Sequence, residues 1–166
     1  MNLRLISGGP SVTYGVGEAL GRVAEGPLAL LLVGDYGTGK TTFVKGLAAG
    51  LGIEDLVRSP SYNIVKRYSM GRRVLVHADL YRTRTDPDIE ELGLLEMASE
   101  DGILAVEWPG RYLVPAREMP NIMVVFSFPS DATPPGEDDQ RRNLEFTWQD
   151  DCPVGIVEVL SALAAR

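Results

Sequence analysis

The chain has 166 residues and a formal net charge of −7, with a sequence pI near 4.7. That length fits one domain spanning residues 1–166, and the acidic balance predicts that RNA is contacted only locally or through a partner. The single cysteine, Cys152, excludes an intrachain disulfide and favours a reduced, cytoplasmic setting. Neither the N-terminal residues nor the longest apolar run has the pattern of a signal peptide or a membrane span, so no membrane association is expected.

The first elements are predicted from hydrophobic periodicity. Residues 2–7 alternate weakly between apolar and polar side chains, which favours an edge strand. Apolar residues then recur at helical spacing after Ser11 and Thr13, either of which is expected to cap a helix that ends at residues 26–27. Residues 28–33 are apolar throughout, as expected of a central strand that is covered on both faces.

A glycine-rich stretch, Gly-Asp-Tyr-Gly-Thr-Gly-Lys-Thr-Thr, follows this strand at residues 34–42 and leads into a helical pattern. It matches the phosphate-binding pattern Gly-x4-Gly-Lys-Thr in the strand–loop–helix context that the pattern requires. Lys40 is expected to bridge the β- and γ-phosphates, the Thr41 hydroxyl to ligate Mg²⁺, and Thr42 to reach the α-phosphate. The residues expected to contact the nucleotide are Asp35, Gly37, Thr38, Gly39, Lys40, Thr41 and Thr42.

A loop and a hairpin follow the helix. Two strands are predicted over residues 62–68 and 73–79, joined by a short turn at residues 69–71. The preceding Ser-Pro-Ser-Tyr at residues 59–62 lies where many nucleotide-hydrolysing proteins place a loop that senses the γ-phosphate, although a plain turn has a similar sequence.

The remaining predicted elements are strands and helices separated by turn-forming residues. In chain order they are a helix over residues 89–97 opened by Pro87, a buried strand over 103–106, a strand over 121–128, a mobile acidic loop over 129–140, a strand over 142–148, and a final helix that Pro153 opens with Asp151 or Cys152 as its cap. No internal repeat is present in the sequence.

Two predicted strands end in a carboxylate, Asp79 and Glu107. In proteins with a phosphate-binding loop, an apolar strand delivers such an acid next to Mg²⁺, because a hard cation with few protein ligands keeps waters that need oriented acceptors. We expect one acid to hold a Mg²⁺-bound water and the other to orient or deprotonate the attacking water. The predicted metal set is therefore Thr41, Asp79 and Glu107, and the predicted catalytic set adds Lys40; the alternative is that each acid is a solvated strand end.

Several other side chains have both a functional and a structural interpretation. His77, the one histidine of the chain, fits a buried core or supporting residue better than a catalytic base. Trp108 fits a stacking residue or a packing residue equally well. Arg58, Arg82 and Arg84 are candidates for a phosphate contact, with surface salt bridging favoured for Arg84.

Four motifs together resemble the TsaE family, also called YjeE, which comprises the bacterial ATPases required for threonylcarbamoyladenosine formation in tRNA. They are Gly-Asp-Tyr-Gly-Thr-Gly-Lys-Thr-Thr-Phe at 34–43, Ser-Pro-Ser-Tyr at 59–62, His-Ala-Asp-Leu-Tyr-Arg at 77–82 and Val-Glu-Trp-Pro at 106–109. The motifs occur in family order, and the resemblance runs from about residue 10 to residue 128. Tyr36 and Thr38 depart from the common family loop but leave its glycines intact, and Ser61 replaces a usual threonine.

The resemblance implies an α/β, P-loop NTPase-like fold, which we expect to have three layers around a mixed, mostly parallel central sheet. It also implies weak, Mg²⁺-dependent ATP hydrolysis that serves a complex of TsaD-like and TsaB-like proteins, with tRNA contacted only indirectly. By position, Lys40, Thr41 and Thr42 match the nucleotide and Mg²⁺ residues of the family. Asp79 matches the acid of the His-x-Asp-x-Tyr-Arg stretch, and Glu107 matches the Glu-Trp-Pro stretch.

Two other classes of function fit the same loop. A small-molecule kinase would need a substrate pocket and an arginine-bearing lid, for which residues 83–88 are the one short candidate. A nucleotide-switched binding module would use ATP only to order a docking surface. A GTPase is disfavoured, because no Asn-Lys-x-Asp or Thr-Lys-x-Asp stretch follows the loop.

Overall fold

The computed structural model describes residues 1–53, 57–58, 64–81, 92–98, 101–110, 119–130, 140–149 and 152–165. Its strands are β1 (Asn2–Ser7), β2 (Leu28–Gly34), β3 (Val65–Met70), β4 (Arg73–Asp79), β5 (Ile103–Glu107), β6 (Asn121–Ser127) and β7 (Arg142–Trp148). Its helices are α1 (Pro10–Val23), α2 (Lys40–Gly50), α4 (Leu94–Ala98) and α5 (Val154–Ala164). None of these described helices is long and apolar enough to cross a membrane.

The strands form one seven-stranded sheet in the order β1-β7-β6-β2-β5-β4-β3. β2 pairs in parallel with β5 and β6, and β5 pairs in parallel with β4. The outer pairings, β1 with β7, β7 with β6, and β4 with β3, are antiparallel. The predicted mixed sheet with a mostly parallel centre is therefore confirmed, and β2 lies in the middle because its apolar residues need cover on both faces.

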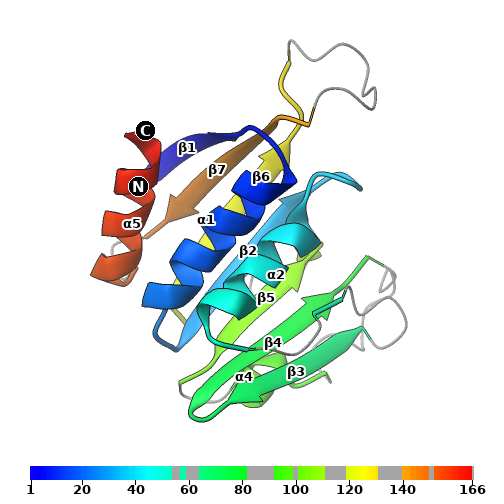
Figure 1. Ribbon diagram of the computed structural model, residues 1–166. Helices are drawn as coiled ribbons and strands as arrows, with labels where there is room; N and C mark the ends of the chain where they lie inside the picture. The colour runs from blue at the N-terminus through cyan, green and yellow to red at the C-terminus, as the bar shows by residue number, and fades with distance from the viewer. Residues whose placement is uncertain are drawn as a thin grey trace.

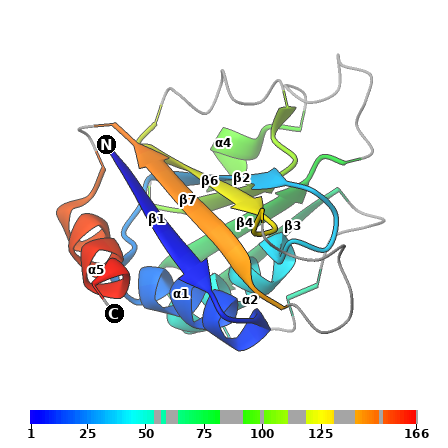
Figure 2. The ribbon, with the colours of Figure 1, turned by 90° about the horizontal axis from the view of Figure 1, so that it is seen from above.

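Helices cover both faces of the sheet, as Figures 1 and 2 show: α1, α2 and α5 lie on one face and α4 lies on the other. Each face has its own apolar cluster. The larger one joins α1, α2 and α5 to alternate residues of the central strands, and the smaller one packs α4 on β4 and β5. The structure thus has the predicted three layers.

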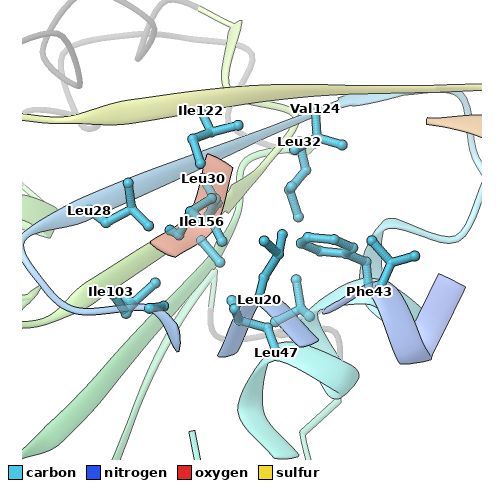
Figure 3. Close-up of a cluster of buried hydrophobic side chains, with 14 of the residues drawn as sticks. Leu20, Leu28, Leu30, Leu32, Phe43, Leu47, Ile103, Ile122, Val124 and Ile156 are labelled. Carbon is cyan, nitrogen blue, oxygen red and sulfur yellow. The ribbon is translucent and has the colours of Figure 1, made fainter. Parts of the chain in front are cut away.

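Phe43 of α2 anchors the helix that follows the glycine-rich loop. Its ring is fully buried and lies edge-on to Phe126 of β6, with the ring centroids 5.7 Å apart. Figure 3 shows Phe43 beside Leu20 of α1 and Leu47 of α2, facing Leu32 and its neighbours on the sheet. Because aromatic rings bury a large apolar area, this contact holds the start of α2 against the ends of β2 and β6.

The predicted helix caps are wrong. α1 begins at Pro10 with Gly9 at the cap position and no side-chain cap, so neither Ser11 nor Thr13 caps it. Proline has a fixed φ and no N–H to satisfy, which lets the helix begin before those two residues. The Thr13 hydroxyl instead contacts the Ser7 hydroxyl at 2.8 Å.

The last helix also begins without a side-chain cap. Pro153 itself occupies the cap position of α5, so Cys152 does not cap the helix, and Asp151 lies outside the described residues. Ile156 and Leu160 of this helix are buried in the larger cluster.

Two other boundaries differ from prediction. β3 begins at Val65 because Ile64 has a φ of 45°, a left-handed conformation that breaks the strand. The described part of the helix predicted over residues 89–97 begins at Leu94, after Gly93 with a φ of 57°. The predicted Pro87 start and residues 131–139 of the predicted mobile loop lie outside the described residues.

α1 and α2 pack with their backbones in contact. At four glycines an added Cβ would lie about 2 Å from a backbone oxygen of the other helix, and these are Gly17 and Gly21 of α1 and Gly46 and Gly50 of α2. At Gly46 this oxygen is that of Tyr14, at 2.0 Å. The two helices therefore move as one unit unless their interface is opened.

Gly46→Ala is expected to lower the free energy of unfolding by about 1–3 kcal/mol, because the added methyl overpacks the interface with α1. Alanine favours a helix over glycine by roughly 1 kcal/mol, so helix propensity alone predicts the opposite sign. Gly15→Ala in α1 is the matched control, since nothing lies within 4 Å of its added Cβ. Urea unfolding of both variants measures the difference; equal stability would contradict the interface.

Candidate functional site

The glycine-rich loop joins the end of β2 to the start of α2 along a path that needs glycine. Gly34 has a φ of 149°, and a Cβ there would lie 2.4 Å from the backbone oxygen of Phe126 on β6. Gly39 has a φ of 101° and is the N-cap of α2. The first N–H groups of a helix have no intrahelical acceptor and carry partial positive charge, so this arrangement presents donors to an anion.

Within the loop, Thr38 has a bracing role. It is fully buried, and its hydroxyl and its N–H both donate to the backbone oxygen of Asp35, at 2.8 and 3.4 Å. Its side chain and its N–H therefore both stabilise the turn. Tyr36, by contrast, is 87% exposed at the tip of the loop.

Lys40 reaches back over the loop. Its ammonium Nζ donates to the backbone oxygens of Gly34 and Asp35, at 2.8 and 2.7 Å, and the side chain is only 4% exposed. Burial lowers the pKa of Lys40 from its ordinary value near 10.5, while the negative charges of Glu107, Asp79 and Asp35 act in the opposite direction. The loop therefore holds a desolvated cation where a phosphate would bring it a full negative charge.

An aromatic pair covers this cation. The ammonium of Lys40 lies 4.2 Å from the ring centroid of Trp108. The Trp108 ring in turn contacts Tyr81, at 4.9 Å between centroids and an interplanar angle of 53°. Trp108 has a φ of 56°, a rare conformation for a residue with a side chain, and it is held there by a bond from its N–H to the oxygen of Leu32. Such strain is typical of functional sites.

Glu107 is the centre of a buried hydrogen-bond network. The Thr41 hydroxyl donates to its carboxylate, at 2.8 Å to Oε1 and 3.1 Å to Oε2. His77 Nε2 lies 2.9 Å from the same Oε1. Glu107 is 3% exposed and His77 is fully buried, so the carboxylate is largely removed from water and depends on these two partners.

Asp79 lies beside Glu107 in the parallel register of β4 and β5. Its Oδ1 accepts the backbone N–H of Tyr81 at 3.2 Å, and its charge acts on Lys40. Because the carboxyl ends of parallel strands meet at one edge of a sheet, both predicted acids lie at the same edge as the loop.

The oxygen atoms at the site fit a Mg²⁺ ion. Thr41 and Glu107 supply oxygen ligands within hydrogen-bond distance of each other, and oxygen is what Mg²⁺ prefers. Among the described residues, no three His, Cys, Asp or Glu side chains gather into a ready-made metal cluster. The residues therefore fit an ion that takes one or two protein ligands and completes its shell with phosphate and water.

Sequence reasoning missed two neighbours of the site. Tyr81 was not singled out, although it lies two residues after Asp79 and so on the same face of the chain as that acid. Thr13 lies against Gly39, with its Cγ2 at 3.4 Å from the Cβ that Gly39 lacks; no local signal in the sequence predicts this contact between distant segments. Thr42 lies half-buried in the first turn of α2.

Of the three arginines predicted to contact phosphate, the structure describes Arg58 alone. Arg58 is exposed. Arg82, Arg84 and residues 59–62 lie outside the described residues, so their predicted roles stay predictions.

A central parallel strand, a glycine-rich loop and a buried helix start, flanked by acids on neighbouring strands, define the class of α/β proteins with a P-loop-like fold. The crystal structure of YdiB from Bacillus subtilis is similar over 98% of this chain and 95% of that one, with a TM-score of 0.72 and 27% identity. The family model of the threonylcarbamoyl adenosine biosynthesis protein TsaE matches residues 9–131. The chain belongs to the TsaE family.

Curated relatives carry the same description, tRNA threonylcarbamoyladenosine biosynthesis protein TsaE. The protein of Treponema pallidum is 35% identical over 125 residues, which are 75% of this chain and 90% of that one. The protein of Haemophilus influenzae is 30% identical over 139 residues, 82% of this chain and 80% of that one. The match to the protein of Bacillus subtilis is 41% identical over 99 residues, and it spans 60% of this chain and 61% of the relative.

The contact of Lys40 with Trp108 predicts an optical signal. A phosphate that draws the ammonium away from the indole changes the surroundings of the ring, so the tryptophan emission is expected to shift when ATP binds. The chain has two tryptophans, and Trp148 is 6% exposed in the core. Fluorescence titration should therefore show the change in the wild type and lose it in Trp108→Phe; a signal that survives in this variant would place its source elsewhere.

Proposed function

We propose that the protein is a Mg²⁺-dependent ATPase that binds ATP on the loop at residues 34–41. Its hydrolysis supports a complex of TsaD-like and TsaB-like proteins in the threonylcarbamoylation of adenosine 37 of tRNA. The observation that carries the proposal is the bond from Thr41 to Glu107 beside the buried ammonium of Lys40. It joins the loop to an acidic strand end, as phosphoryl transfer to water requires.

In this proposal Lys40 binds the phosphates, and the acids bind Mg²⁺. Lys40 places its positive charge on the β- and γ-phosphates and so exchanges the carbonyls of Gly34 and Asp35 for stronger, charge-assisted partners. Thr41 and Glu107 would hold Mg²⁺, with Asp79 as a further candidate ligand. When bound, the ion supplies neutralisation of the charge that develops on the phosphate oxygens.

The two acids also handle the attacking water. Glu107 and Asp79 are adjacent in register at the end of the sheet, so one carboxylate can orient or deprotonate the water while the other holds a metal-bound water. Positioning and charge neutralisation account for most of the barrier reduction in phosphoryl transfer. The loss of either acid is therefore expected to lower the rate more than the stability of the fold.

The proposed partners are proteins, and the proposed setting is the cytoplasm. A net charge of −7 disfavours broad contact with tRNA, so the tRNA is reached through the partner complex. Tyr36 is 87% exposed at the loop tip, next to the nucleotide site, and offers an aromatic contact of the kind that protein interfaces use. The one cysteine of the chain, Cys152, is not in a disulfide, as expected in a reduced compartment.

Lys40→Ala is expected to weaken ATP binding by about 10–100-fold, the factor that corresponds to losing hydrogen bonds to a charged group. Lys45→Ala is the matched control, because Lys45 is an exposed lysine of the same helix. Calorimetric titration of ATP measures both affinities. An unchanged titration for Lys40→Ala would remove the basis of the phosphate-loop assignment.

Glu107→Gln keeps the shape of the side chain and a bond to Thr41, so ATP binding is expected to survive. Phosphate release should fall by about 10²–10³-fold, because the variant lacks the carboxylate charge. Glu145→Gln is the matched control, since Glu145 is a half-exposed acid of β7 that pairs with Arg4.

The same assay separates the proposal from its rivals when it is run without a phosphate acceptor. An ATPase releases phosphate from ATP and water alone, whereas a small-molecule kinase is nearly silent. A binding module would retain partner turnover in Glu107→Gln, and that result would exclude hydrolysis as the function.

A further inference from the structure

His77 is a buried titratable side chain to which the proposed mechanism gives no role. His77 lies on β4, between the edge strand β3 and β5; it is fully buried, and its Nε2 contacts Glu107 on β5 at 2.9 Å. Its second ring nitrogen, Nδ1, is buried and has no hydrogen-bond partner among the described residues. A core histidine whose purpose is stability would use both nitrogens, because a buried polar atom without a partner is costly.

The position of His77 follows from the strand register. His77 pairs with Ala105 of β5, two residues before Glu107. Side chains two residues apart lie on the same face of a strand. Ala105 carries only a methyl group, which leaves space for the imidazole to extend along β5 toward the carboxylate. The contact therefore depends on a small residue at one position and on the ring at the other.

The contact with His77 constrains the carboxylate of Glu107. Nε2 of His77 lies 2.9 Å from Oε1 of Glu107, and an N–H at this nitrogen donates to that oxygen. The Thr41 hydroxyl donates to the same carboxylate. Glu107 is therefore held by contacts from two elements, β4 and α2.

We propose that His77 is a positioning residue that holds the carboxylate of Glu107 toward Thr41 and the Mg²⁺ position. The inference rests on the proposed function. A free glutamate samples many rotamers and loses rotamer entropy when it is fixed. Two donors, His77 on one side and Thr41 on the other, fix it in advance. Groups that orient a metal ligand in this way commonly change metal affinity or activity about 10–100-fold when they are lost.

The experiment compares His77→Leu, which fills the buried space but has no donor, with His77→Gln, whose amide N–H can take the place of Nε2–H. ATP binding in EDTA is expected to be unchanged in both variants, because the side chain at position 77 does not contact the loop. His77→Leu should raise the Mg²⁺ concentration needed for half-maximal phosphate release by about 10-fold or more, and His77→Gln should restore most of the loss. Binding of a non-hydrolysable ATP analogue, titrated with and without Mg²⁺, gives a readout that does not depend on turnover.

Val76→Ala is the control for a general loosening of β4. Val76 is fully buried on the opposite face of the strand, in the smaller apolar cluster, so its truncation lowers stability without touching Glu107. If Val76→Ala raises the Mg²⁺ requirement as much as His77→Leu at equal loss of thermal stability, the role of His77 is structural and the inference is overturned.

A double-mutant cycle gives the decisive result. If His77 acts through Glu107, adding His77→Leu to Glu107→Gln should cost almost no further rate, whereas independent roles give additive losses. A wild type that neither binds the analogue nor releases phosphate would overturn the proposed function and this inference with it. A wild type that does both, with His77→Leu indistinguishable from it, would overturn the inference alone.

Discussion

The parallel pairing of β2 with β5 is the constraint on which the site depends. Leu32 of β2 is in register with Glu107, the last residue of β5, and the chain of β2 turns directly into the loop and α2. The carboxylate is thereby brought within hydrogen-bond distance of Thr41, which is far away in sequence. A shift of the register by one residue would turn Glu107 to the opposite face of the sheet and leave the helix start without an acid.

Close packing fixes the position of the loop and α2 relative to these strands. α2 is held against the sheet by Phe43 and against α1 by glycines that allow backbone contact. Two charged side chains of the site are also buried. Lys40 and Glu107 are each less than 5% exposed, and each has its hydrogen-bond partners within the site. A buried charge without a partner is strongly destabilising, so the geometry of the site and the stability of this edge of the sheet depend on each other.

Much of the fold could be predicted from local sequence. The apolar run of β2, the glycine pattern after it and the alternation in β7 are signals within a few residues, and the strands were found at those places. An apolar run that ends in a carboxylate is also a local signal. Both acids predicted from this signal lie at the edge of the sheet that carries the loop.

The contacts between distant segments could not be predicted. The tilted contact of Tyr81 with Trp108, whose ring lies beside the ammonium of Lys40, joins three segments of the chain. It depends on strand order, which no local pattern encodes. The contact of His77 with Glu107 depends on the β4–β5 register and on the small size of Ala105. The helix caps were mispredicted for a related reason: Thr13 has the right residue type for a cap, but its hydroxyl is engaged by Ser7 from the neighbouring strand.

The charged side chains Lys40 and Glu107 already have hydrogen-bond partners within the described site. If the protein hydrolyses ATP as proposed, these existing contacts would slow hydrolysis in the absence of a partner. Lys40 already donates to two loop carbonyls and lies under Trp108, and Thr41 already donates to Glu107. ATP and Mg²⁺ must exchange each of these contacts, so only the difference between the new and the old interactions favours the bound state. A partner that binds the exposed Tyr36 and Tyr81 only when the aromatic cover has moved would shift this balance, because a ligand changes an equilibrium by its differential affinity for the two states. Under the proposed function, a dependence on a partner would follow from a site whose side chains already bind one another.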